Sequence, residues 1–214
     1  MKHGKLVISL DFELFWGVRD SRTVDGYGKN ILGVHQVIPR LLETFDQKNV
    51  KATFSTVGFL FFETKLDLLN NLPDKKPSYV NQELSPYLGH FEHVGENSVI
   101  DKFHFAPHLI RMIQQKPQHE IGTHTFSHYY CLEEGQNVEE FKADMEAAKK
   151  IATRYNLNLT SLVFPRNQFN DEYLKACKEA GILCYRGNEH SWIYTAKSKE
   201  NESKFKKKAI PKDS

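Results

Sequence analysis

The feature that most constrains the fold of this chain is an alternation between short β-branched apolar runs and longer segments of helical periodicity. The apolar run 5–10, KLVISL, ends at Asp11 and is typical of a buried parallel strand. Residues 33–48 then carry apolar side chains at helical spacing, and a second strand pattern follows within 48–61. The same alternation predicts helices at 105–115, 137–155 and 170–180 and strands at 119–123, 161–164 and 182–186. It favours an α/β fold with a parallel sheet, open or closed into a barrel.

Composition narrows the class of protein. The chain has 214 residues, enough for one sizeable domain, and it contains no apolar run long enough to span a bilayer and no signal peptide. We therefore expect a cytoplasmic protein without membrane insertion. Residues 197–214 contain seven lysines and three acidic residues, a local net charge of +4. Since the whole chain has a net charge of +2, residues 1–196 have a net charge of −2. This distribution predicts a disordered lysine-rich tail and a body that does not bind nucleic acid.

Three segments with carboxylate, histidine or arginine side chains fall at predicted strand ends, where the loops of a parallel α/β sheet converge. The segment SLDFELFWG carries Asp11 and Glu13, which point to the same side if strand geometry continues. The segment GTHTFSHYY carries His124 and His128, and LVFPRNQFN carries Arg166. Two histidines and a carboxylate are a familiar ligand set for a hydrolytic zinc site.

Two other histidine pairs have similar spacing. His104 and His108 fall in a helix pattern and are interpreted as partly exposed helix residues. His90 and His93 lie in 64–103, a stretch without strong periodicity that suggests a functional insertion. The pair after the strand pattern, in GTHTFSHYY, is the better metal-binding candidate.

These motifs resemble those of the polysaccharide deacetylase family, also called the NodB-homology family or carbohydrate esterase family four. The resemblance implies that Asp11 is the catalytic base and that Glu13, His124 and His128 bind the metal. It also implies that Arg166, in FPRNQFN, orients the base. Aromatic residues near the motifs are candidates for binding the sugar, although they could equally be core residues; those that we select are Trp16, Phe169 and Trp192.

The resemblance further implies a distorted (β/α) barrel. This chain supplies about five strands, so we expect an incomplete barrel that lacks the last strands, with a catalytic domain at 1–196 and the tail at 197–214. The implied activity is hydrolysis of N-acetyl or related acyl groups from a saccharide by metal-bound water. The implied cofactor is one divalent ion, Zn²⁺ first, with Co²⁺, Mn²⁺ or Ni²⁺ as alternatives.

One departure keeps a second hypothesis open. The family's final motif ends in a histidine that serves as general acid, and His190, in NEHSW, does not match its position. The alternative is a non-catalytic or truncated protein that binds sugar and metal without efficient turnover. A glycosidase that uses Asp11 and Glu13 is less favoured, because two acids on one strand rarely straddle a glycosidic bond. The sugar, its linkage and the oligomeric state stay open.

Overall fold

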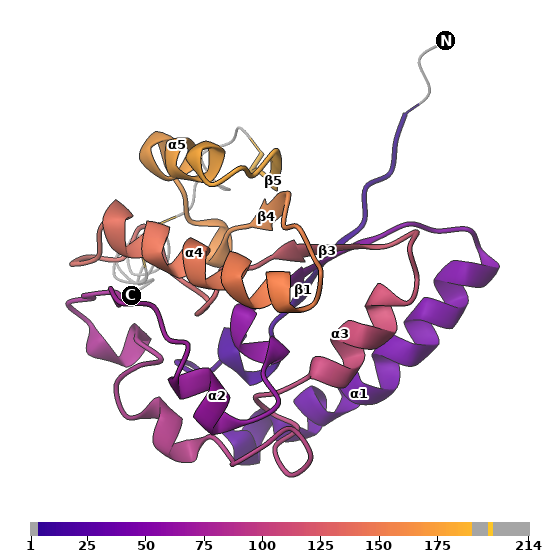
Figure 1. Ribbon diagram of the computed structural model, residues 1–214, viewed down its shortest axis with the longest axis horizontal. Coiled ribbons are helices and arrows are strands. Elements are labelled where there is room, and N and C mark those ends of the chain that lie inside the picture. Colours follow the sequence, from indigo (N-terminus) through magenta and orange to yellow (C-terminus); the bar gives the residue numbers. More distant parts are fainter. Residues whose placement is uncertain (1–3, 190–196, 199–214) are drawn as a thin grey trace, which may run out of the picture.

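A computed structural model describes residues 4–189 and 197–198 of the chain (Figure 1). Within these residues, five parallel strands form one sheet in the order β1-β2-β3-β4-β5. The strands are β1 Ser9–Phe12, β2 Thr53–Thr56, β3 Glu120–Thr123, β4 Ser161–Val163 and β5 Cys184–Arg186. The α-helices are α1 Val24–Gln47, α2 Lys65–Leu69, α3 Pro107–Gln114, α4 Val138–Arg154 and α5 Asp171–Glu179. Every connection between consecutive strands contains a helix, so the predicted α/β class is confirmed.

The sheet is strongly curled. In a flat sheet with strands about 4.8 Å apart, β1 and β5 would be separated by roughly 19 Å. The Arg186 side chain on β5 nevertheless reaches β1, where its Nη2 lies 2.8 Å from Asp11 Oδ2 and its Nη1 lies 3.2 Å from Ser9 Oγ. The strands therefore bend into a half-barrel, which confirms the predicted incomplete (β/α) barrel.

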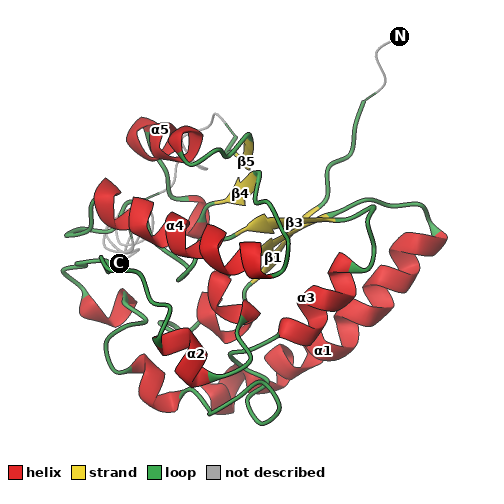
Figure 2. Cartoon of the chain, viewed as in Figure 1, coloured by secondary structure: helices red, strands yellow, loops and turns green. Residues whose placement is uncertain are grey.

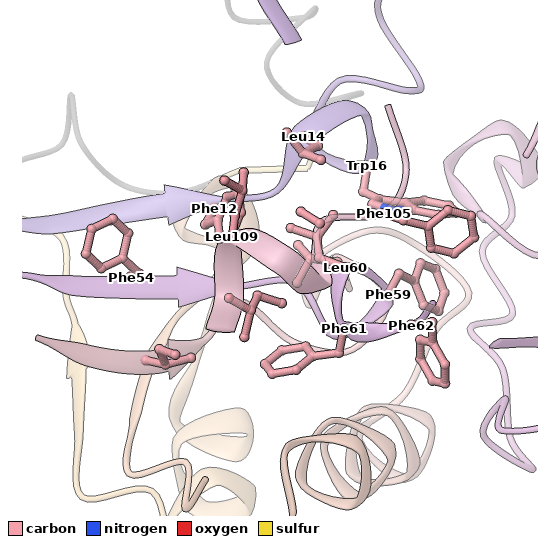
Figure 3. Packing of buried hydrophobic residues seen from close by; sticks show 14 of the residues in the cluster. Phe12, Leu14, Trp16, Phe54, Phe59, Leu60, Phe61, Phe62, Phe105 and Leu109 are labelled. Carbon is pink, nitrogen blue, oxygen red and sulfur yellow. The ribbon is translucent and has the colours of Figure 1, made fainter. Parts of the chain in front are cut away.

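The two faces of the sheet differ in polarity. The outer face is largely apolar, and its residues join core clusters that also contain residues of α1, α3 and α4. Figure 3 shows Phe12 and Phe54 of the strands and Leu109 of α3. The strand residues of this face include Leu10, Phe54, Ile121 and Leu162. The inner face carries small or polar residues, which include Ser9, Asp11, Ser55, Gly122 and Ser161. Strand residues that face the helices thus supply the core, while the curled inner face carries the polar groups.

Two elements begin at residues other than those predicted from the sequence. The first strand begins at Ser9 instead of residue 5, and Leu6 and Val7 are 88% and 79% exposed. The pairing of β1 with β2 begins at Ser9, and the Ile8 carbonyl oxygen just before it accepts from Thr53 N at 3.0 Å. Leu6 and Val7 lie before this pairing. The first long helix begins at Val24 instead of residue 33, because the Thr23 side chain accepts a hydrogen bond from Gly26 N and caps it.

The other predicted helices and strands, from 105 onward, agree with the structure to within two residues. Residues 64–103 run largely as loops and 3₁₀ turns after the short α2 (Figure 2), and they pack on the body through Leu68, Leu84 and Val94. Most of the predicted tail lies outside the described residues. Within the described part of the chain, no helix is both long and apolar enough to cross a membrane.

Candidate metal centre

Glu13, His124 and His128 converge from the carboxyl ends of two strands. Glu13 directly follows β1, His124 directly follows β3, and β2 lies between these strands. A chain reversal after β3 returns His128 to the side of His124, with ring centroids 4.9 Å apart. One ligand atom from each of the three residues lies within 4.8 Å of the others. The structure thus brings together the three side chains that were predicted to bind a metal.

A single carboxylate oxygen contacts both imidazoles. Glu13 Oε2 lies 3.1 Å from His124 Nε2 and 3.0 Å from His128 Nε2. His124 Nδ1 lies 2.7 Å from the carbonyl oxygen of Val163. Since a carbonyl only accepts, Nδ1 of His124 donates to Val163, and Nε2 is the ring nitrogen that faces Glu13. This arrangement of a backbone carbonyl behind a histidine is common in metal sites.

The charge state of the cluster suits a cation. Burial alone would raise the pKa of Glu13, but hydrogen bonds from His124 and His128 outweigh it and hold that pKa well below its usual value. Burial lowers the pKa of His128 to about 4, although the Glu13 carboxylate acts in the opposite direction. At neutral pH the cluster therefore offers the Glu13 carboxylate and the neutral imidazole of His128, the charge states in which these side chains bind divalent ions such as Zn²⁺.

Gly17 leaves the space that the Glu13 side chain occupies. It ends the 3₁₀ turn Leu14–Gly17, which begins directly after Glu13. A Cβ atom at position 17 would lie 2.0 Å from Glu13 Cδ and 2.1 Å from Oε1. The present position of the Glu13 side chain therefore requires a glycine at position 17. Sequence reasoning missed this role, although the glycine is visible in FELFWG.

Asp11 pairs with an arginine that the sequence did not suggest. Its Oδ2 accepts a hydrogen bond from Arg186 Nη2 at 2.8 Å, and the two side chains are 34% and 36% exposed. The expected partner was Arg166. Arg186 ends the last described strand, so the strand-end rule that selected the other segments would also have selected it if it had been applied to β5.

Arg166 is held elsewhere. Its guanidinium forms an ion pair with Asp20, lies 3.7 Å from Glu133 Oε1, and stacks on the Tyr130 ring with Cζ 4.2 Å from the centroid. Arg166 and Asn167 both have left-handed backbone, with φ of 54° and 53°. This turn after β4 directs the guanidinium toward Tyr130, so the expected pairing of Arg166 with Asp11 is wrong in this structure.

A family model for polysaccharide deacetylase matches residues 25–185. The chain belongs to the polysaccharide deacetylase family. The matched segment contains His124, His128, Arg166 and Phe169 and begins after Asp11 and Glu13. A search of curated proteins finds no match.

Solved structures of the same family are similar to this chain at low sequence identity. A putative polysaccharide deacetylase from Mycobacterium smegmatis is 16% identical, with 84% of this chain covering 49% of that one at a TM-score of 0.52. A de-N-acetylase from Aggregatibacter actinomycetemcomitans is 16% identical over 86% of this chain and 63% of that one, with a TM-score of 0.49. A CE4 family pseudoenzyme from Bacillus anthracis is 16% identical over 84% and 42%, with a TM-score of 0.46. The chain thus spans less than half of the Mycobacterium and Bacillus proteins.

The three aromatic residues that were expected to bind the sugar have different outcomes in the structure. Trp16 is fully buried, and its indole N–H donates to the carbonyl oxygen of His104 at 2.8 Å. It lies among core rings (Figure 3), so the expectation that it contacts substrate is wrong. Phe169 is partly buried, with its ring against those of Phe164 and Tyr185, so its contact with substrate stays a prediction. Trp192 lies outside the described residues, as does His190.

The remaining histidine pairs do not join the metal cluster. His104 precedes α3, is 2% exposed and donates from Nδ1 to Asp101 Oδ2 at 2.8 Å, so its interpretation as a partly exposed helix residue is wrong. His108 stacks on His35. His90 and His93 border a groove of about 410 Å³ on the 64–103 segment. Within the described residues, Glu13, His124 and His128 are the one cluster with a metal-binding set of ligand atoms.

Proposed function

We propose that this chain is a metal-dependent deacetylase that hydrolyses an N-acetyl or related acyl group on a saccharide. The observation that carries this proposal is the convergence of Glu13, His124 and His128 on one point in a polysaccharide deacetylase fold. In the proposal these three side chains hold one divalent cation, Zn²⁺ first. Such a cation lowers the pKa of water to about 7 and polarises an acyl carbonyl.

Asp11 is the proposed base. It lies two residues before Glu13 on the inner face of the sheet, and its side chain is 34% exposed. Its carboxylate accepts the proton of the attacking water, while Arg186 fixes the orientation of the carboxylate through the 2.8 Å hydrogen bond. Arg166 supports the site indirectly, because it packs on Tyr130, whose ring lies 5.1 Å from that of His128.

The rate of hydrolysis at such a site depends on the leaving group. An amide nitrogen leaves poorly unless it is protonated, and general acid catalysis typically contributes about 10²–10⁴-fold. The sequence offers no histidine in the position of the family's general acid. We therefore expect slow hydrolysis of N-acetyl saccharides and measurable hydrolysis of aryl acetates, whose phenolate leaves without a proton.

The test compares acetate release from acetylated saccharides and from an aryl acetate by the Zn²⁺-loaded chain and by Asp11→Asn. The proposal expects the variant to keep its metal and to lose activity on both substrates. Brisk amide turnover would show that an acid is already present in the chain. If wild-type rates are no higher than those of Asp11→Asn, the proposal fails and the alternative, a non-catalytic protein that binds sugar and metal, is favoured.

A further inference from the structure

The loop that carries the two histidines has an unusual backbone. Thr125 and His128 both adopt left-handed conformations, with φ of 63° and 59°. Side chains other than glycine and asparagine rarely adopt this region, and a β-branched threonine is among the least suited to it. Such conformations persist only where surrounding contacts hold them. The loop is held partly by its own atoms, because Tyr129 N donates to Thr125 Oγ1 at 2.7 Å. It is also held from outside, where Gly58 N and Phe59 N donate to the carbonyl oxygens of Thr125 and Phe126.

Asp144 on α4 supplies side-chain contacts to the loop from outside it. Its Oδ1 accepts from the backbone N–H of Phe126 at 2.6 Å, and its Oδ2 accepts from the backbone N–H of Ser127 at 3.1 Å. The Ser127 hydroxyl also donates to Oδ2. One carboxylate thus receives three hydrogen bonds from two consecutive residues that lie between His124 and His128. Charge-assisted bonds of this kind are stronger and more directional than bonds between neutral groups.

The burial of Asp144 is costly for the fold. The residue is 1% exposed, and burial raises its pKa to about 6 even though the Ser127 and Phe126 donors favour the ionised form. An apolar residue at this position of α4 would avoid that cost, since Phe141, Met145 and Ala148 on the same helix pack into the core. A buried carboxylate at this position therefore needs an explanation other than core packing.

We propose that Asp144 is a positioning residue that holds the 124–128 loop in the conformation in which His128 Nε2 meets Glu13 and His124. Without its three hydrogen bonds, Thr125 and His128 can relax toward ordinary backbone conformations. His128 Nε2 then leaves the point that it shares with Glu13 Oε2, 3.0 Å away. The inference concerns how the metal site is organised, so its consequence for metal binding rests on the proposed function.

The test substitutes Asp144→Asn, which keeps the shape of the side chain but replaces one acceptor oxygen with a donor group. The matched control is Glu146→Gln, because Glu146 is exposed on the same helix. We expect Asp144→Asn to lower Zn²⁺ affinity by about 10- to 100-fold, the range for groups that orient metal ligands. Competition with a chromophoric chelator measures this affinity on the metal-stripped chain, and Glu146→Gln should match the wild type.

A second measurement separates this inference from the proposed function. In the metal-free chain, the amides of Phe126 and Ser127 should be protected from hydrogen exchange in the wild type and should lose protection in Asp144→Asn. If the wild type binds no Zn²⁺, the proposed function fails while this measurement still tests the role of Asp144. Ser127→Ala removes one of the three hydrogen bonds and should give a smaller loss in the same direction, which covers the case that Asp144→Asn does not fold. Unchanged amide protection and Zn²⁺ affinity within about threefold of wild type in the folded variants would overturn the inference.

Discussion

A methyl group at Gly17 should disable the metal centre while leaving the fold intact. In Gly17→Ala the new Cβ would lie 2.0, 2.1 and 2.5 Å from Glu13 Cδ, Oε1 and Oε2, well inside normal contact distance. The atoms that it meets are the far end of a flexible side chain, so Glu13 can swing away with little disturbance of the backbone. In doing so it must leave His124 and His128, whose Nε2 atoms now lie 3.1 and 3.0 Å from its oxygen.

The expected magnitudes differ for affinity and for stability. We expect Zn²⁺ affinity to fall by about 10- to 100-fold or more, as when a metal ligand loses its orientation. Replacing glycine by alanine at a compatible backbone angle stabilises a protein by about 0.4–1 kcal/mol. The loss of the Glu13 contacts acts in the opposite direction. We therefore expect the free energy of unfolding to change by less than about 1 kcal/mol, or roughly 2–4 °C in Tm.

The assay combines chelator competition for Zn²⁺ with thermal unfolding of the metal-free chain. Gly33→Ala is the matched control, because a Cβ at Gly33 on α1 meets no atom within 4 Å. That variant should bind Zn²⁺ like the wild type. If Gly17→Ala also binds Zn²⁺ like the wild type, Glu13 does not need its present position and is not the ligand that we infer.

Three further predictions concern the base, its partner and acid stability. Asp11→Asn should retain Zn²⁺ and lose turnover; loss of the metal would make Asp11 a ligand. Arg186→Ala should lower kcat for aryl acetates more than Arg166→Ala does, because Arg186 contacts Asp11 directly; the reverse order would restore Arg166 as the partner of the base. Burial, together with positive neighbours, lowers the pKa of His90 in the folded chain to about 3. As the pH drops from about 6.5 toward 3, the unfolded chain therefore binds a proton at His90 before the folded chain does, and the free energy of unfolding falls. His90→Gln should flatten the pH dependence of urea unfolding in that window, and an unchanged slope would contradict this reasoning.

Local sequence pattern was sufficient to predict most of the fold. Hydrophobic periodicity places α4 and α5 to within a residue, because each presents an apolar stripe and begins at an asparagine cap, Asn137 or Asn170. The start of α1 was missed because Gly26 and Gly28 weaken the helical signal in a segment that tertiary packing makes helical. The strand predicted from residue 5 was too long because an apolar run does not reveal where its neighbour begins to pair.

The candidate site was predictable where it depends on strand ends and short spacing, as for Glu13, His124 and His128. It was not predictable where it depends on closure of the sheet or on a turn. Arg186 reaches Asp11 because the half-barrel curls, and Arg166 turns to Tyr130 because two consecutive residues are left-handed. Trp16 was misassigned because an aromatic residue at a strand end has the same local pattern whether it packs in the core or faces a ligand.

The most direct test of the central claim is metal stoichiometry, measured by Zn²⁺ titration of the chelator-stripped chain. The account predicts one equivalent of Zn²⁺ per chain for the wild type and strongly weakened binding for His124→Ala and His128→Ala. It predicts undiminished binding for His104→Ala, since His104 pairs with Asp101 away from the cluster. Equal Zn²⁺ binding by all four proteins would contradict the assignment of Glu13, His124 and His128 as the metal centre.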